Sequence, residues 1–184
     1  SICAVWTEAR VDSGQDVKAV RYVQGQWSNI EVISDNNTNN KESPDIAVNA
    51  LDQFGVVWYE TSGSYKIIKF AYHRAGYWRT PLDISSATTV AYLPAIESDD
   101  SYFHIVWQNT DGTYYQIYYG YYDYFNDVVG TPVAITSSNY NNYSPALAID
   151  GSGNLHCVWT GHDTSYNIWY SKYTTSWSVP YAIT

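Results

Sequence analysis

Short apolar runs return along the chain with a period of about fifty residues. The clearest markers are four Val-Trp pairs, which end at Trp6, Trp58, Trp107 and Trp159. The runs are only a few residues long, rich in Val, Ile, Tyr and Thr, and bounded by Asn, Asp, Gly and Ser. Such runs are typical of β-strands between tight turns. The pattern therefore predicts a repeated unit built from strands alone.

Each unit divides into four short strands. The first begins at a proline (Pro44, Pro94 and Pro145), which is tolerated there because the first residue of a strand need not donate to the ladder. The second strand ends in Val-Trp, and the third is rich in tyrosine. The third strands are predicted at 17–22, 67–72, 115–122 and 166–173, and the fourth strands at 27–34, 78–85, 129–136 and 177–184.

A meander sheet that is apolar on both faces must be covered by its neighbours. Four such sheets in series predict an all-β protein, a β-propeller of four repeats (blades) of four-stranded antiparallel meander sheets. The chain begins in the second strand of a repeat, so the first blade is expected to lack its innermost strand. We expect residues 1–184 to form a single β-propeller domain or segment, with repeats at about 1–40, 41–90, 91–141 and 142–184.

The repeat pattern leaves open how the array closes. A four-bladed ring with one incomplete blade, a segment of a larger ring, and a homodimer closing an eight-bladed ring all satisfy it. A stack of β-sandwiches is a further alternative, but it would usually show Greek-key crossings and less equal spacing.

Charge and composition narrow the classes of partner. The formal net charge is −9, and the few Lys and Arg form no run, so a nucleic-acid partner is excluded. No apolar stretch is long enough for membrane insertion. Acidic β chains rich in Tyr, Asn and Thr are common outside the cytoplasm, so an extracellular or cell-surface location is expected. Cys3 and Cys157 are interpreted as small core residues, with a disulfide as the alternative.

The last repeat carries a family resemblance. Its elements Gly-Asn-Leu-His-x-Val-Trp, at residues 153–159, and Trp-Ser-x-Pro, at residues 177–180, resemble the repeats of the BNR (bacterial neuraminidase, sialidase-like) β-propeller superfamily. The resemblance implies a propeller fold over nearly the whole chain. In that family the turn before the fourth strand carries an Asp-box, Ser-x-Asp-x-Gly-x-Thr-Trp. The corresponding residues 171–177 contain neither the Asp nor the Gly, so the Asp-box is degenerate here.

Sialidase activity is not expected from this sequence. A sialidase needs three arginines around the substrate carboxylate and a tyrosine activated by a glutamate. The chain has only Arg10, Arg21, Arg74 and Arg79, and it lacks the family's Arg-Ile-Pro signature. Two of the four, Arg21 and Arg79, fall on outer strands, away from the axis. The resemblance therefore favours the fold and weakens the enzymatic assignment.

The loops that follow the second strands are predicted to carry a ligand site. They bring carboxylates, amides and aromatic rings to one face, which is the composition that sugar binding uses. Solvated loops of an acidic protein are the plainer alternative for the same residues. The candidate ligand-binding residues are Glu8, Arg10, Tyr59, Glu60, Asn109, Asp111, His162 and Asp163.

The remaining polar motifs predict no catalytic residue, no metal site and no cofactor. Asp45 and Glu97 are acids on otherwise apolar inner strands, where a glycosidase would place its carboxylates, but an axis-lining polar residue is the simpler interpretation. His104 and His156 occupy equivalent positions before the Trp of their repeats and are interpreted as structural. The segment 150–154 is a turn rather than a calcium loop, because it lacks alternating oxygen ligands.

Three functions remain compatible with the sequence. The first is a non-catalytic binding module for a glycan or protein ligand, either alone or as a segment of a larger surface protein. The second is a fragment of a propeller glycosidase or lyase. The third is a purely structural repeat segment.

Overall fold

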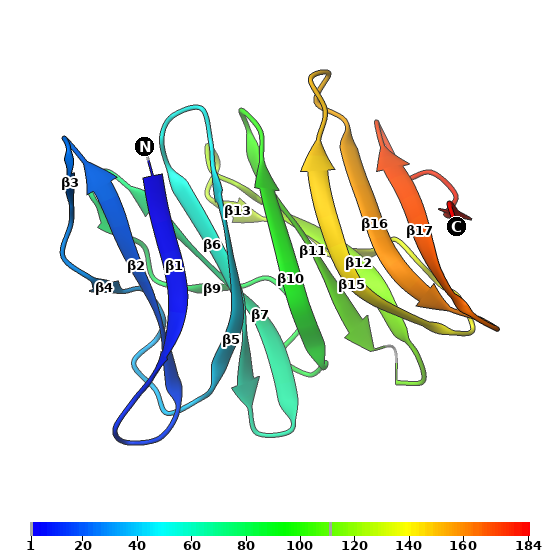
Figure 1. Ribbon diagram of the computed structural model, residues 1–184, viewed down its shortest axis with the longest axis horizontal. Helices are drawn as coiled ribbons and strands as arrows, with labels where there is room; N and C mark the ends of the chain where they lie inside the picture. Colours follow the sequence, from blue (N-terminus) through cyan, green and yellow to red (C-terminus); the bar gives the residue numbers. More distant parts are fainter. Residues whose placement is uncertain (1, 111) are drawn as a thin grey trace.

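The computed structural model describes residues 2–110 and 112–184, and these residues form four antiparallel sheets and no helix (Figure 1). The first sheet contains β1 (Ile2–Ala9), β2 (Gln15–Val23), β3 (Gln26–Trp27) and β4 (Glu31–Val32). The second contains β5 (Lys41–Val48), β6 (Phe54–Ser62), β7 (Tyr65–Arg74), β8 (Tyr77–Trp78) and β9 (Leu82–Asp83). The third contains β10 (Ala91–Ser98), β11 (Tyr102–Thr110), β12 (Tyr115–Asp123), β13 (Val128–Val129) and β14 (Val133–Ala134). The fourth contains β15 (Asn141–Ile149), β16 (Leu155–His162), β17 (Tyr166–Tyr173) and β18 (Tyr181–Ala182).

The four sheets are blades that pack side by side in chain order. Strand β1 packs on β5, β5 on β10, and β10 on β15, so the inner strands line one central face. The first and last sheets lie at opposite ends of the long axis, and the array is open in Figure 1. Within the described residues no strand pairs with the inner edge of β1. The predicted all-β fold of four meander blades, with the innermost strand missing from the first, is confirmed.

The inner strands begin earlier than predicted, and proline is not their first residue. In β5, β10 and β15 the pairing register shifts just around the proline, which sits inside a β-bulge. The residues before the prolines, Ser43, Leu93 and Ser144, have φ of 52°, 47° and 50°. A bulge tolerates proline because the bulged residues leave the hydrogen-bond ladder. The bulge is thus a repeated feature that re-aims the start of each inner strand.

The outer strands are also interrupted. Instead of one continuous fourth strand, the first three blades have two short pieces, for example β8 and β9 on either side of Pro81. The residue before the break still pairs, since Arg79 N donates to Tyr72 O at 2.9 Å. Proline then removes a donor from the ladder. In the first blade Ile30 stands at that position, so proline explains the break in the second and third blades only.

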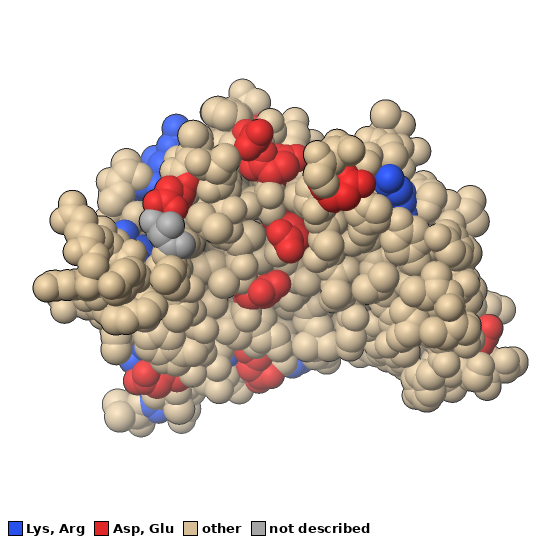
Figure 2. Space-filling view, turned by 45° about the horizontal axis from the view of Figure 1, so that its top comes forward, with Lys and Arg blue, Asp and Glu red and all other residues tan. Residues whose placement is uncertain are grey.

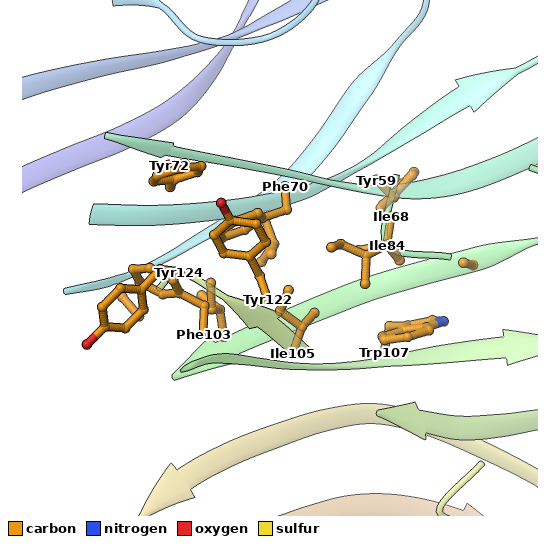
Figure 3. Close-up of a cluster of buried hydrophobic side chains, with 14 residues drawn as sticks. Tyr59, Ile68, Phe70, Tyr72, Ile84, Phe103, Ile105, Trp107, Tyr122 and Tyr124 are labelled. Carbon is orange, nitrogen blue, oxygen red and sulfur yellow. The ribbon is translucent and has the colours of Figure 1, made fainter. Parts of the chain in front are cut away.

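Aromatic side chains fill the space between the second and third blades. Phe70, Tyr72, Phe103 and Tyr122 lie with ring centroids 4.9 to 6.1 Å apart (Figure 3). Gly55 makes room for Phe103, because a Cβ at Gly55 would stand 2.5 Å from that ring. Rings in tilted contact bury large apolar areas and add about 0.5 to 1.5 kcal/mol per pair. This cluster holds the two middle blades in a fixed relation.

The repeated tryptophans are part of the core in three blades. Trp58, Trp107 and Trp159 are at most 2% exposed, whereas Trp6 in the first blade is half-buried. Both cysteines are free thiols, as the sequence predicted. Burial raises the pKa of Cys157 to about 12.

Candidate functional site: a groove between the second and third blades

A cavity of about 520 Å³ lies where the second blade leads into the third. One wall is formed by Asp83 at the end of β9 and by the linker that follows it, including Ser86. The other is formed by Trp107 and Asn109 of β11, Tyr118 of β12 and the residues 129–132. We call this cavity the Trp107 groove.

The local sequence explains why these side chains meet. Trp107 and Asn109 are two residues apart on β11, so they project from the same face of the strand. Tyr118 is the registered partner of Trp107 on β12, and the two rings stack with centroids 6.1 Å apart. Gly120 leaves space for the indole, since a Cβ there would come within 3.1 Å of it.

Two buried polar atoms in this groove have no hydrogen-bond partner. They are the indole Nε1 of Trp107 and the side-chain Oδ1 of Asn109. The two residues are 1% and 6% exposed. Figure 3 shows the indole nitrogen at the end of the ring turned away from the aromatic cluster. Leaving a buried donor or acceptor unpaired costs about 1 to 3 kcal/mol each, so a ligand that reached these two atoms would stabilise one donor and one acceptor.

The matching position of the fourth blade shows the paired alternative. There the indole of Trp159 donates to Asn142 Oδ1 at 2.8 Å, and Asn142 in turn donates to Ser138 Oγ at 2.7 Å. In the third blade the residue equivalent to Asn142 is Ala91, which has no side-chain acceptor. The Trp107 indole is therefore unpaired because its repeat lacks the amide. A cavity of about 230 Å³ remains beside Trp159 and Trp169.

The junction between the first and second blades is closed by a cation. Lys69, which corresponds to Tyr118, forms ion pairs with Asp83 at 2.7 Å and Asp35 at 3.4 Å. The ammonium group therefore occupies the place that an aromatic ring takes in the later blades. In the third blade Tyr118 stands at this repeat position and lines the Trp107 groove.

The predicted loop residues lie at the same end of successive blades. No hydrogen bond or ion pair joins any two of the seven that are described, and Asp111 lies outside the described residues. In the first blade Glu8 pairs with Lys18 at 2.6 Å, and Arg10 pairs with Asp12 at 2.8 Å. Arg10 also lines a separate cavity of about 630 Å³.

The second- and fourth-blade candidates have local partners. The hydroxyl of Tyr59 donates to Glu42, and burial raises the pKa of that phenol, with Glu42 adding to the shift. Glu60 is 3% exposed and accepts hydrogen bonds from the amides of Asn37 and Asn39. His162 stacks near Tyr166 with centroids 4.1 Å apart.

Asp163 accepts backbone hydrogen bonds from the two residues that follow it, which lower the pKa of its carboxyl. The Trp107 groove thus contains one predicted residue, Asn109. The role of the other candidates stays a prediction.

The acids of the inner strands lie on the central face. In Figure 2 most of the surface is uncharged, and acidic patches run through its middle while the basic ones lie mainly toward its edges. Asp45 accepts the backbone N–H of Ile96 at 3.0 Å and so links β5 to β10. Burial raises the pKa of Glu97, and the charge of Asp45 raises it further.

Each of the four arginines has partners of its own. Arg21 pairs with Glu31 at 3.1 Å, Arg74 donates to the carbonyl of Tyr124 at 3.1 Å, and Arg79 lies over the ring of Tyr77. Three guanidinium groups do not converge, so the geometry needed for a sialic acid carboxylate is missing from residues 2–110 and 112–184. In the same residues no three His, Cys, Asp or Glu side chains are placed to hold a metal ion.

The two equivalent histidines each join an aspartate to a tyrosine. Asp99 and Tyr119 bind the two ring nitrogens of His104 at 2.9 and 2.8 Å. Asp150 and Tyr170 bind those of His156 at 3.0 and 2.7 Å. The structural interpretation of both histidines agrees with these contacts.

No family model and no curated protein matches the chain in sequence. Its structure is similar to the BP39L lectin from Burkholderia pseudomallei, with a TM-score of 0.63 and 14% identity over 99% of this chain and 52% of the lectin. The polysaccharide lyase Uly1 matches with a TM-score of 0.61 and 9% identity over 91% of this chain and 51% of the lyase. The K499G mutant of the NanB sialidase from Streptococcus pneumoniae matches with a TM-score of 0.55 and 12% identity over 89% of this chain and 26% of the sialidase.

The fold is that of a β-propeller. At these identities the likeness concerns the fold alone, and the chain spans about half the length of the lectin and the lyase. The resemblance to sialidase-like repeats therefore holds in fold, through the NanB structure, and the Asp-box has no counterpart in the sequence. None of the described residues forms a helix that could cross a membrane.

Proposed function

We propose that this chain is a non-catalytic carbohydrate-binding module and that the Trp107 groove is a binding site. The observation that carries the proposal is the unpaired indole N–H of Trp107 beside the unpaired amide oxygen of Asn109. A sugar hydroxyl both donates and accepts, so one or two hydroxyl groups would satisfy both atoms. The free energy lost to the two unpaired groups, about 2 to 6 kcal/mol, would be recovered on binding.

The rest of the groove fits the same chemistry. The half-buried ring of Tyr118, together with Val129 and Pro132, provides an apolar wall for the C–H face of a pyranose. Asp83 supplies a carboxylate at the rim, where it also pairs with Lys69. A few polar groups set in an apolar wall are typical of small-ligand sites.

The similar structures support the proposal that the ligand is a carbohydrate, but they do not indicate which carbohydrate. Their names describe a lectin, a polysaccharide lyase and a sialidase, all of which bind carbohydrate. They do not distinguish binding from catalysis. We propose that the predicted loop residues, such as Arg10 and Asp163, extend the binding surface, and that the protein acts outside the cell or at its surface.

A glycosidase or lyase fragment is the second candidate, because Glu97 has the raised carboxyl pKa that a general acid needs. The third candidate, a purely structural segment, would show neither glycan binding nor turnover. Two assays separate the three functions: a glycan array with the labelled protein, and turnover of chromogenic glycosides and uronate polymers. We expect array binding without turnover. Hydrolysis or elimination that is lost in Glu97→Gln would refute the non-catalytic assignment, and binding to no glycan would refute the lectin-like function.

A further inference from the structure

A second cavity, of about 180 Å³, is lined only by aromatic side chains and lies between the third and fourth blades. Tyr119 and His104 are buried at its floor, and Tyr102, Tyr121 and Tyr173 are half-buried around them. It lies at the end of β11 opposite to Asn109, so it is separate from the Trp107 groove. We call it the tyrosine cage.

The rings of the tyrosine cage support one another. The centroid of Tyr119 lies 6.3 Å from that of Tyr121 and 5.9 Å from that of Tyr173. Tyr102 meets Tyr121 edge to face at 5.1 Å. Gly130 backs the ring of Tyr121, since a Cβ at Gly130 would stand 2.3 Å from it. The half-buried rings are therefore held in place by packing rather than free to turn.

The floor of the cage is electron-rich. Burial alone would raise the pKa of Asp99, but the hydrogen bond from His104 and those from backbone N–H groups lower it overall, so Asp99 is a carboxylate. A carboxylate can only accept, so Nε2 of His104 carries the proton, and Nδ1 accepts the hydroxyl of Tyr119. A phenol that donates its proton to a base has a more negative ring face. The Asp99–His104–Tyr119 series thus strengthens the attraction of this ring for a cation.

No positive charge competes at this place among the described residues. Burial lowers the pKa of His104, so its ring is neutral at pH 7. No Lys or Arg lines the cage, and the chain as a whole carries a formal charge of −9. A small cation is therefore attracted both by the ring faces and by the surrounding field.

We propose that the tyrosine cage binds a small alkylated ammonium group, such as a trimethylammonium head group. Its volume is several times the roughly 30 Å³ share of one water, which leaves room for a compact organic cation. Methyl groups fit walls made of ring carbon, and the spread positive charge of such a group needs no hydrogen-bond partner. A sugar would need more polar partners than the tyrosine hydroxyls and His104 supply.

Proton NMR of choline chloride titrated with the protein tests this site. The neutral isostere 3,3-dimethylbutan-1-ol is the matched control, because it has the same shape without the charge. We expect the choline methyl protons to shift upfield under the ring currents, and choline to bind at least about tenfold more tightly than the alcohol. Equal affinities for the two, or no choline shift at millimolar protein, would overturn the proposal.

Variants locate the binding without disturbing the buried floor. We expect Tyr121→Leu to weaken choline binding about tenfold and Tyr121→Phe to stay within about twofold of wild type, because Phe keeps the ring face. Tyr181→Leu removes an exposed tyrosine of the last blade, outside the cage, and should leave binding unchanged. Unchanged affinity in Tyr121→Leu, with its fold verified by circular dichroism, would place any choline binding elsewhere and refute the assignment.

Discussion

Replacing Asn109 with leucine is expected to stabilise the protein while it abolishes binding at the Trp107 groove. In the ligand-free structure Asn109 Oδ1 is buried without a partner. Such an acceptor costs about 1 to 3 kcal/mol, and an apolar side chain of similar size removes that cost. Allowing for imperfect packing of leucine, we expect a gain of about 1 to 2 kcal/mol, or roughly 2 to 8 °C in Tm for a chain of this length.

Asn142→Leu is the matched control, because Asn142 is the amide that pairs with the tryptophan indole in the fourth blade. Its amide is fully engaged: it accepts from Trp159 at 2.8 Å and donates to Ser138 at 2.7 Å. Leucine there would leave the Trp159 indole unpaired, so we expect a loss of about 2 to 4 kcal/mol. The two substitutions are chemically the same and should change stability in opposite directions.

Urea unfolding followed by tryptophan fluorescence measures both variants, and calorimetry gives the Tm. Opposite signs would show that the amide oxygen of Asn109 is unpaired in the free protein. A loss of stability in Asn109→Leu similar to that in Asn142→Leu would refute the reasoning, because it would mean that Asn109 already has a partner in the free protein.

Three further predictions concern the rest of the chain. Burial lowers the pKa of His104, so as pH drops the unfolded state binds this proton before the folded state does. The free energy of unfolding should therefore fall as pH drops below about 6.5, and the urea midpoint should fall more between pH 7 and pH 5 in wild type than in His104→Gln. Equal falls in the two proteins would contradict this. Burial raises the pKa of Cys3 to about 11 and that of Cys157 to about 12, so a thiol reagent at pH 8 should label both slowly in the native protein and rapidly in urea. Fast labelling of Cys157 in the native protein would contradict its burial. We propose that two open arrays associate to close a larger ring, so light scattering should give twice the 20.9 kDa chain mass; a monomer at all concentrations would contradict it.

The blade architecture was predictable because the apolar runs of one blade recur about every fifty residues along the sequence. A Val-Trp pair lies in the second strand of every blade, but the prediction that the strand ends there was wrong, because each strand runs three to four residues past its Trp. Trp58, Trp107 and Trp159 pair with equivalent residues of the third strands. The predicted first residue of the inner strands was wrong, because these strands begin several residues before the proline. The residue before each proline adopts a positive φ, which ordinary strand patterns do not signal, so the bulge could not be anticipated from Pro44 or Pro94.

The candidate site was predictable only in part. Asn109 was singled out as a polar loop residue, whereas Trp107 was treated as a marker of the repeat. The available signal was the spacing Trp-x-Asn, which puts an indole and an amide on one strand face. The groove itself is formed by Tyr118 and its neighbours together with the linker of another blade. The groove is formed by side chains of two neighbouring blades, and the sequence pattern of a single repeat does not indicate which side chains of the two blades meet.

The central claim is that the Trp107 groove binds carbohydrate, and one measurement tests it most directly. A glycan array is probed with wild type, with Asn109→Leu and with Leu51→Ala, which changes an exposed turn of the second blade outside the groove. We predict that wild type and Leu51→Ala bind the same glycans, and that Asn109→Leu loses these signals while remaining folded. Array signals that persist undiminished in Asn109→Leu would contradict the account.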